Sequence, residues 1–204
     1  MPEGPQRIRS LDEARAEVQD CRRCPLYQFA TQAVFGEGPA HADIMFVGEV
    51  PGDQEDIEGR PFVGPAGRLF DRMLERVGIE RSRTYVTNAV KHFKFTQRGK
   101  RRLHQRPNAG EVAACRFWLD LEREYVKPRV VVALGATAAQ SLLGRAATIR
   151  SLRGKPVDLE DGGVLYVTVH PSFLLRIREQ DDFRQQQAAF EADLRAVRAL
   201  AAVR

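Results

Sequence analysis

The chain has 204 residues, a length that suits one domain, and its hydrophobic content of 43% is enough for a buried core. No stretch approaches the roughly 20 consecutive apolar residues of a membrane span, and the first residues lack the apolar region of a signal peptide. These features exclude a membrane-spanning protein and predict a single cytoplasmic domain over residues 1–204, with a net charge of +5 that one basic segment accounts for.

Two of the three cysteines, Cys21 and Cys24, follow a predicted helix that Ser10 caps. Their C-x-x-C spacing is typical of a metal clip, and Pro25 directly after the second thiol is a feature of iron–sulfur sequences. Together with Cys115 they offer three thiolate ligands, one fewer than a metal ion or cluster usually takes, and a histidine could supply the fourth. The alternative is a C-x-x-C redox pair beside a separate buried cysteine, and the residues alone leave both readings open.

The apolar run Ile44–Val47 has the length of a buried strand, and it ends in a loop rich in glycine and proline, Gly48–Asp53. Glycine lets a backbone approach a ligand closely. Because ligands of open α/β sheets bind beyond the carboxyl ends of strands, this loop is a candidate active-site floor. The alternative is an ordinary turn between a strand and a helix. The loop and the residues after it carry five acidic side chains: Glu49, Asp53, Glu55, Asp56 and Glu58.

Strand and helix patterns alternate along the rest of the chain. Further strands are predicted over Thr84–Val90, Arg129–Leu134 and Val164–Val169. Helices are predicted from Leu69 to a C-cap at Gly78, from Asn108 with a capping box to Glu111, from Gly135 to Leu143, and at the chain end with Phe190, Leu194, Val197 and Leu200 on one stripe. This alternation predicts an α/β fold with three α/β/α layers around a central, mainly parallel four-stranded sheet.

Residues 91–106 hold seven basic side chains and no acidic one, so the rest of the chain has a net charge of −2, from +5 minus +7. A local basic patch is typical of a phosphate-binding surface, although most charged runs are solvated loops. Phe93, Phe95 and Leu103 lie among the charges, and aromatic rings can stack on bases, which favours a nucleic-acid-binding loop. The basic residues are Lys91, Lys94, Arg98, Lys100, Arg101, Arg102 and Arg106.

Polar residues also stand where the predicted strands end. Glu49 follows the first strand, Asn88 lies late in the second, and His170 follows the fourth. Each alone is most simply a turn former or a satisfied side chain. Because the carboxyl ends of parallel strands share one sheet edge, we expect the three to converge near Phe62 and the basic loop.

Four motifs in this order resemble those of the iron–sulfur uracil-DNA glycosylases: GEVPG at 48–52, GRPFVG at 59–64, TNAVK at 87–91 and HPS at 170–172. The resemblance runs from the first cysteine to the last helix. The segment KRRLH at 100–104 resembles the inserted loop of family X. Members of family X resemble the hydrolytic family 4 enzymes but end covalently attached to DNA through the loop histidine.

The resemblance implies a [4Fe–4S] cluster held by Cys21, Cys24, His92 and Cys115. Here His92 stands where family 4 has a cysteine ligand. An imidazole in place of a thiolate makes the centre less negative. We assign the cluster a structural role, since it would tie the N-terminal segment to the basic loop and to the helix that carries Cys115.

The resemblance also implies the roles of the strand-end residues. A uracil must leave the duplex or be met on a single strand, and Phe62 would then stack on it. The Asn88 amide can accept a hydrogen bond from N3–H and donate one to O4, a pattern that cytosine reverses. His170 would stabilise the charge of the departing base, while Glu49 and Asp53 suit the positive charge that develops at C1′.

His104 is the predicted nucleophile, because a neutral imidazole is far more nucleophilic than water. We expect the flanking cations to lower its pKa. Its product with C1′ has no easy second half-reaction, so one turnover would leave a covalent complex. Arg102 would contact a phosphate or hold the loop in place.

The motif positions of Gly48, Val50, Gly52 and Ser172 imply substrate binding as well. Two departures from the family X pattern occur: Val50 replaces the usual glutamine, and Phe173 replaces a small residue. The first bears on covalent efficiency more than on uracil recognition, because the backbone can supply the contact at Val50.

Three functions therefore compete: a covalent family X-like glycosylase, a hydrolytic family 4-like glycosylase with turnover, and a non-catalytic iron–sulfur protein that binds single-stranded DNA or senses redox state. For the first, the expected partner is uracil-containing DNA, with single strands preferred and free uracil as product. We expect a monomer that does not bind membranes.

Overall fold

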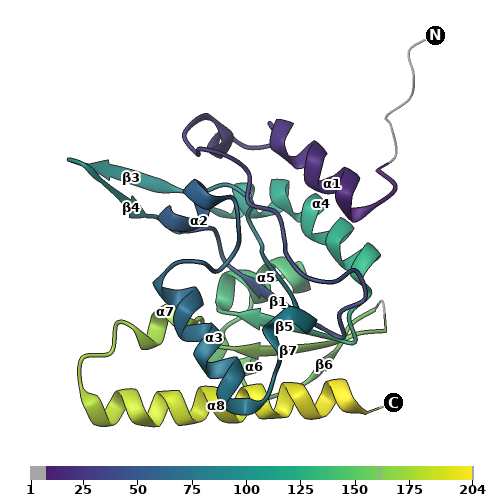
Figure 1. Cartoon of the computed structure of the whole chain (residues 1–204), viewed down its shortest axis with the longest axis vertical. Coiled ribbons are helices and arrows are strands. Elements are labelled where there is room, and N and C mark those ends of the chain that lie inside the picture. Colours follow the sequence, from purple (N-terminus) through teal and green to yellow (C-terminus); the bar gives the residue numbers. More distant parts are fainter. Residues whose placement is uncertain (1–7, 161, 204) are drawn as a thin grey trace.

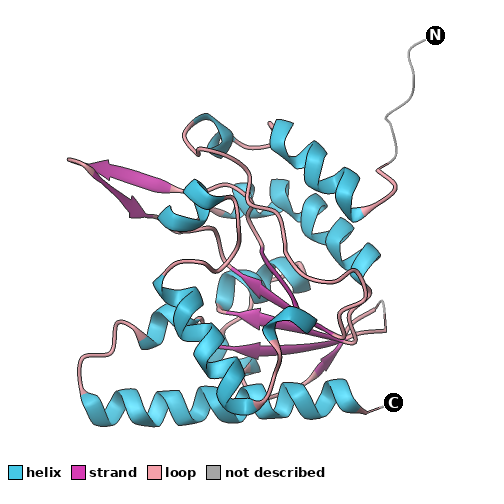
Figure 2. Cartoon of the chain, viewed as in Figure 1, coloured by secondary structure: helices cyan, strands magenta, loops and turns pink. Residues whose placement is uncertain are grey.

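A five-stranded sheet lies at the centre of the protein in a computed structural model, which describes residues 8–160 and 162–203 (Figure 1; Figure 2). The strand order is β2-β1-β5-β7-β6, and every neighbouring pair is parallel except β6 and β7. The strands are β1 (Ile44–Gly48), β2 (Tyr85–Asn88), β5 (Val130–Leu134), β6 (Val157–Asp158) and β7 (Val164–Thr168).

The predicted α/β/α architecture is confirmed, but the sheet has five strands rather than four. The additional strand, β6, is only two residues long and pairs antiparallel with β7 at the sheet edge. Two residues are too few to show a strand periodicity, so this strand could not be predicted from the sequence. The central position of the apolar strand β5, between β1 and β7, is as expected.

Helices cover both faces of the sheet, and Figure 1 shows α4 and α1 on one side and α8 on the other. One apolar cluster joins that second face to α3 and α8 and includes Phe46, Phe70 and Phe190. The other joins the first face to α4 and α5 and includes Leu119 and Leu142. The helices are α1 (Leu11–Glu17), α2 (Asp53–Glu58), α3 (Pro65–Val77), α4 (Ala109–Val126), α5 (Ala136–Leu143), α6 (Ile149–Leu152), α7 (Pro171–Leu174) and α8 (Gln180–Ala202), with short 3-10 turns at Val18–Asp20, Pro25–Gln28 and Arg81–Arg83.

The helix ends follow the predicted capping chemistry. The Ser10 hydroxyl accepts a hydrogen bond from the Glu13 amide at the start of α1. Asn108 and Glu111 form the reciprocal capping box of α4, which satisfies two amides that the helix leaves free. Gly78 ends α3 in the left-handed region with φ of 72°. Among the described residues, no helix is long and apolar enough to cross a membrane.

The segment predicted as a basic loop is instead a two-stranded hairpin, β3 (Phe95–Arg98) and β4 (Arg101–His104), which projects from the body of the protein (Figure 1). Gly99, with φ of 58°, makes the tight turn between the strands. The sequence did not reveal this hairpin, because neither of its faces is buried enough to show an apolar pattern along the strands. The acidic loop after β1 likewise contains a short helix, α2.

Candidate active site

The carboxyl ends of β1 and β2 bring the first two site residues together, because Gly48 and Asn88 are register partners in the parallel pair. Asn88 is 3% exposed, and within the described part of the chain its side-chain amide has no hydrogen-bond partner. A Cβ at Gly48 would lie 2.3 Å from Asn88 Oδ1 and 2.7 Å from Phe62 Cζ. Only glycine therefore lets the amide and the aromatic ring close over the strand end.

Phe62 is held against this strand end in an unfavourable backbone conformation. Its φ is 57°, in the left-handed region that bulky residues avoid. A Cβ at Gly67, in the first turns of α3, would lie 1.8 Å from Phe62 O, so that helix packs directly on the Phe62 backbone. The ring centroid of Phe62 lies 5.8 Å from that of His170. Strain of this kind is typical of functional sites, where the surrounding packing enforces it.

His170 caps α7, and this contact fixes which ring nitrogen carries the proton. Nδ1 accepts a hydrogen bond from the Ser172 amide at 3.1 Å, and the Ser172 hydroxyl lies 2.9 Å from the same atom. Burial, with the charges of His104 and Arg176, lowers the pKa of His170 to about 4. At neutral pH the ring is thus uncharged with its proton on Nε2, which makes Nε2 a hydrogen-bond donor. Ser172 acts here by orienting His170.

The carboxylate of Glu49 is held from two sides. The Thr137 hydroxyl, at the start of α5, donates a hydrogen bond to Glu49 Oε1 at 3.0 Å. Arg106 Nε lies 3.5 Å from the same oxygen and also donates to Thr137 Oγ1 at 3.1 Å. Glu49 is therefore a fixed negative charge beside the strand ends, with three quarters of its side chain covered.

Arg102 fastens the hairpin to α2. Its guanidinium donates to Asp53 Oδ1 at 2.6 Å and to the buried carboxylate of Asp56. The same guanidinium lies 5.2 Å from the ring centroids of Phe93 and Phe95. Asp56 in turn accepts hydrogen bonds from the amide and the hydroxyl of Thr31, which anchors α2. Of the two expected roles for Arg102, these contacts favour holding the hairpin.

His104, the last residue of β4, extends from this clamp toward the strand ends. Its ring centroid lies 6.2 Å from that of Phe93. The residue remains exposed, but desolvation by the surrounding protein lowers the pKa of its imidazole. The charge of Arg176 also lowers this pKa, whereas the charge of Glu49 raises it. The expected direction holds, but the cause differs from the expectation, because the flanking basic residues do not contribute appreciably. The charges of His104 and Arg176 also act on His170, so the two histidines are close enough to influence each other's protonation.

The predicted basic patch is smaller than its sequence suggested. Lys91 is wrongly assigned to it, since the side chain is 0% exposed and its ammonium pairs with Glu122 Oε2 at 2.6 Å in the interior. Lys94 pairs with Glu111 at 2.9 Å. The charges that form no ion pair with any residue in the described ranges are those at the hairpin tip: Arg98, Lys100 and Arg101.

The three cysteines are reduced and lie in one region around the start of α4. Cys21 Sγ accepts a hydrogen bond from Trp118 Nε1 at 3.1 Å, and Cys115 Sγ accepts one from the Lys91 amide at 3.1 Å. Burial raises the pKa of the Cys115 thiol to about 12, and the charges of Cys24 and Cys21 act in the same direction. The thiols are therefore close enough to influence one another. Residues 8–160 and 162–203 contain no group of three or more ligand side chains arranged to hold a single metal ion.

His92 lies next to this region, and a bridge pairs its backbone with Ala33. The ring is 4% exposed, and burial lowers its pKa. No hydrogen bond joins it to another described residue. The ring is therefore available to a metal or cluster, which histidine commonly ligates through a ring nitrogen.

The remaining predicted site residues have structural environments of their own. Val50 is 7% exposed and packs in an apolar cluster with Val90 and Trp118, so only its backbone is available to a ligand. Gly52 caps α2, and a Cβ there would lie 2.6 Å from Glu55 Oε2. Glu55 Oε1 accepts a hydrogen bond from the Gly64 amide at 2.8 Å, which ties α2 to the Phe62 loop.

The sequence did not reveal Thr137 and Arg176 as site residues. Thr137 follows Gly135 directly after β5, so its place at a strand end was the available signal. Arg176 follows α7 in a segment with no motif. Only the folded chain shows that its charge acts on His104 and His170.

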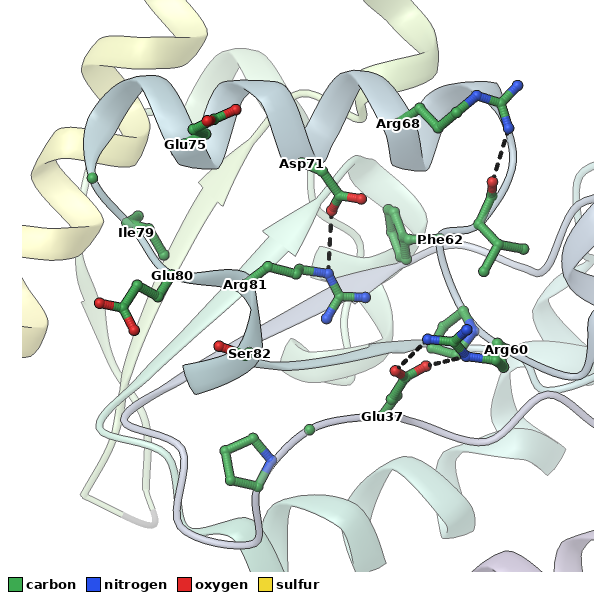
Figure 3. Close-up of a pocket in the computed structure, with 15 residues that line it drawn as sticks. Glu37, Arg60, Phe62, Arg68, Asp71, Glu75, Ile79, Glu80, Arg81 and Ser82 are labelled. Atoms are coloured by element: carbon green, nitrogen blue, oxygen red, sulfur yellow. Dashed lines mark hydrogen bonds and ion pairs between the residues drawn. The ribbon is translucent and has the colours of Figure 1, made fainter.

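A groove of about 1060 Å³ lies on the other side of Phe62, between α3 and the Arg81–Arg83 turn (Figure 3). Two of the arginines that line it are already paired: Arg60 pairs with Glu37 at 2.8 Å, and Arg81 pairs with Asp71 at 3.3 Å. The residues at the strand ends, apart from Phe62, do not line it. The groove therefore lies behind the Phe62 loop and is not the candidate site.

Comparison with known proteins agrees with this geometry. Residues 35–195 match the uracil DNA glycosylase superfamily. The chain is 41% identical over 165 residues to a type-4 uracil-DNA glycosylase of Thermotoga maritima, covering 80% of this chain and 82% of the relative. It is 37% identical over 174 residues to the type-4 enzyme of Sulfurisphaera tokodaii, covering 81% and 76% respectively. It is 30% identical over 174 residues to a type-5 uracil-DNA glycosylase of Pyrobaculum aerophilum, covering 78% and 74%. The chain therefore belongs to the uracil DNA glycosylase superfamily.

Proposed function

We propose that this uracil-DNA glycosylase acts as a family X-like enzyme, which excises uracil and becomes covalently attached to the deoxyribose through His104. The observation that supports the proposal is the clamp of Arg102 on Asp53 and Asp56, which holds β4 with His104 close enough to Glu49 and His170 for their charges to interact. A histidine on an unanchored loop would not be held in reach of C1′.

The flipped uracil would lie between the strand ends and the Phe62 ring. The unpartnered Asn88 amide would accept a hydrogen bond from N3–H and donate one to O4. His170 Nε2–H would donate to O2, where negative charge grows as the base departs. A neutral donor suits this task, because an imidazolium would hand its proton to the base rather than stay in place.

The bond between C1′ and uracil N1 breaks with its electron pair on the base. The fixed carboxylate of Glu49 would stabilise the positive charge at C1′, and Asp53, shared with Arg102, lies farther along the same segment. A lone pair of the neutral His104 imidazole then forms the new bond to C1′. The lowered pKa of His104 keeps that lone pair free near neutral pH. Uracil leaves as the free base after taking up a proton from solvent.

A hydrolytic reaction with turnover is the second candidate, since two of the relatives named above are type-4 uracil-DNA glycosylases. Water would then take the place of His104 at C1′. The two candidates share the base pocket and differ only in the nucleophile.

The replacement His104→Ser tests the proposal. The variant should form no adduct with uracil-containing single-stranded DNA in denaturing electrophoresis, yet it should release uracil and turn over, since the base pocket is intact and water can enter. The matched control is Gln105→Ser, an exposed neighbour that should form the adduct as the unmodified protein does. An adduct whose deoxyribose maps by mass spectrometry to any residue other than His104 would overturn the mechanism.

We also propose that Cys21, Cys24, His92 and Cys115 hold a [4Fe–4S] cluster. The donor set fits, because N–H groups already point at two of the sulfurs and the His92 ring has no partner in the described ranges. A cluster takes one ligand per iron, so its ligands surround a larger space than those of a single ion. When bound, it would tie the N-terminal segment to α4 and the hairpin.

Iron and sulfide analysis tests the cluster, with about four of each expected per chain. His92→Cys should keep the iron, and His92→Ala should lose most of it. Iron-free protein with full activity and an unchanged unfolding midpoint would reject the assignment. Three further predictions stay open: that the protein prefers single strands, that it is a monomer and that it is cytoplasmic. The exposed cations of the hairpin tip support contact with DNA phosphates.

A further inference from the structure

A second cavity, of about 530 Å³, lies between α4 and α5. These two helices contact each other on the same face of the sheet (Figure 1). A cavity of this size with a mainly apolar lining and few polar groups is typical of a small-molecule site. We name it the α4–α5 cavity. Its small and apolar walls come from Pro107, Ala109, Val112, Ala113, Gly144 and Ala146.

The charged residues around the α4–α5 cavity are all basic. Arg106, Arg116 and Arg145 line it, and none of the described aspartates and glutamates does. Arg116 pairs with Asp120 at 3.4 Å along α4, whereas Arg145 is exposed and has no ion pair with any residue in the described ranges. The cavity therefore favours a ligand that carries negative charge at the rim and apolar surface inside.

A buried hydroxyl without a partner lines the same cavity. Ser141 is 4% exposed, and its Oγ has no hydrogen-bond partner within residues 8–160 and 162–203, although a serine in a helix can usually bond to a carbonyl of its own helix. Leaving a buried polar atom unsatisfied costs free energy. A polar atom of a bound ligand would remove that cost.

The α4–α5 cavity also adjoins the candidate active site. Thr137 and Arg106 line it, and these two residues hold Glu49: Arg106 Nε donates to Thr137 Oγ1 at 3.1 Å, and Thr137 donates to Glu49 Oε1 at 3.0 Å. A DNA strand with its target nucleotide beside Glu49 would pass the rim of the cavity within the reach of one nucleotide.

We propose that the α4–α5 cavity binds the nucleotide next to the target deoxyuridine in the substrate strand. Its phosphate lies at Arg145 and Arg116, its base or sugar lies against the apolar wall, and Ser141 supplies one hydrogen bond. A single strand can turn its next nucleotide into this cavity, whereas stacking and pairing hold that nucleotide in a duplex. The inference rests on uracil-containing DNA as the substrate, but not on the covalent step.

Fluorescence anisotropy tests the inference with short single strands that carry one non-cleavable 2′-fluoro-deoxyuridine. The strands have neighbours on both sides, on the 5′ side only, or on the 3′ side only. Arg145→Ala removes the free cation, and Ala113→Phe fills the cavity from its exposed wall. The matched controls are Arg150→Ala and Ala188→Phe, both at exposed positions that do not line the cavity.

Both test variants should weaken binding of the full strand about fivefold or more, as loss of one stacked nucleotide does. The two variants should bind as tightly as the unmodified protein to the one strand that lacks the nucleotide bound in the cavity, which is the neighbour on either the 5′ or the 3′ side. Arg145→Ala should also reduce the salt slope by about 0.7, the value for one phosphate on a single strand. The two controls should bind every strand as the unmodified protein does.

Unchanged binding of the full strand by both test variants would overturn the inference. So would an equal loss on every strand, because that pattern reports a change in the fold rather than a lost subsite. Adduct formation is not a readout here, so failure of the His104 mechanism leaves this test intact. Unmodified protein that binds none of the strands would overturn both the inference and the proposed substrate.

Discussion

At the scale of single residues, the geometry of the proposed uracil site depends on glycines that leave space and on the strained backbone of Phe62. Gly48 makes room for Asn88 and Phe62, and Gly67 lets α3 press on the Phe62 backbone. Asn88 is 3% exposed, and its amide forms no hydrogen bond with any described residue, so both of its polar atoms are available to a complementary base edge. A site that leaves a polar group unpaired in this way discriminates strongly against a base with the reversed pattern.

The depressed pKa of His170 makes a prediction about stability and pH. Its pKa is about 4 in the folded protein against an ordinary 6.5, so the unfolded chain takes up a proton first as the pH falls. The folded state therefore loses stability between about pH 6.5 and 4, and above that window the full contribution is present.

Replacement of His170 by Asn removes this contribution. The difference in unfolding free energy between unmodified protein and His170→Asn, measured by urea denaturation, should shift in favour of the variant as the pH falls through the window. A difference for His170→Asn that stays constant with pH would show that the ring is not held neutral.

At the scale of elements, the hairpin is the device that distinguishes the two candidate mechanisms. Its charged strands bury little surface, so its orientation depends on Arg102 and on the rings of Phe93 and Phe95. The acceptors for Arg102 are Asp53 and the fully buried Asp56 on α2. The position of His104 is thus set by the contacts of Arg102, which lies two residues earlier on β4.

Arg102→Gln should accordingly separate adduct formation from uracil release. A loosened hairpin misplaces the nucleophile, which should slow the single-turnover rate of adduct formation by on the order of 10–100-fold at saturating DNA. Uracil release should stay within about threefold, because the base pocket lies on other elements. Arg101→Gln, the exposed neighbour on β4, should keep the adduct rate. A normal adduct rate in Arg102→Gln would mean that the clamp does not position His104.

At the scale of the whole molecule, a buried polar network joins parts of the chain that are far apart in sequence. Glu122 on α4 accepts hydrogen bonds from the Gly36 amide at 2.8 Å and from Thr87 Oγ1 at 2.9 Å, and it pairs with Lys91 at 2.6 Å. Lys91 Nζ also donates to the Asn88 carbonyl at 2.7 Å. The network therefore fixes the end of β2, where Asn88, the proposed reader of the base, lies.

Glu122→Gln should be strongly destabilising, because it leaves the Lys91 ammonium buried without its counter-charge. We expect a loss of about 3–5 kcal/mol in the free energy of unfolding by chemical denaturation. The exposed Asp120→Asn on the same helix should change it by less than about 0.5 kcal/mol. Adding Lys91→Met should recover part of the loss, and no recovery would mean that the buried charge is not its cause.

The sequence by itself determined the elements whose signals are local: the apolar strands β1, β5 and β7, the capped helices α1, α3 and α4, and the strand-end motifs that identify the superfamily. Strand periodicity and capping depend on neighbouring residues, so they can be read along the chain. Only the tertiary structure decided that residues 95–104 form a hairpin, that Lys91 is buried, and that Arg102 binds α2. These features depend on partners up to 49 residues away, whose proximity no local pattern encodes.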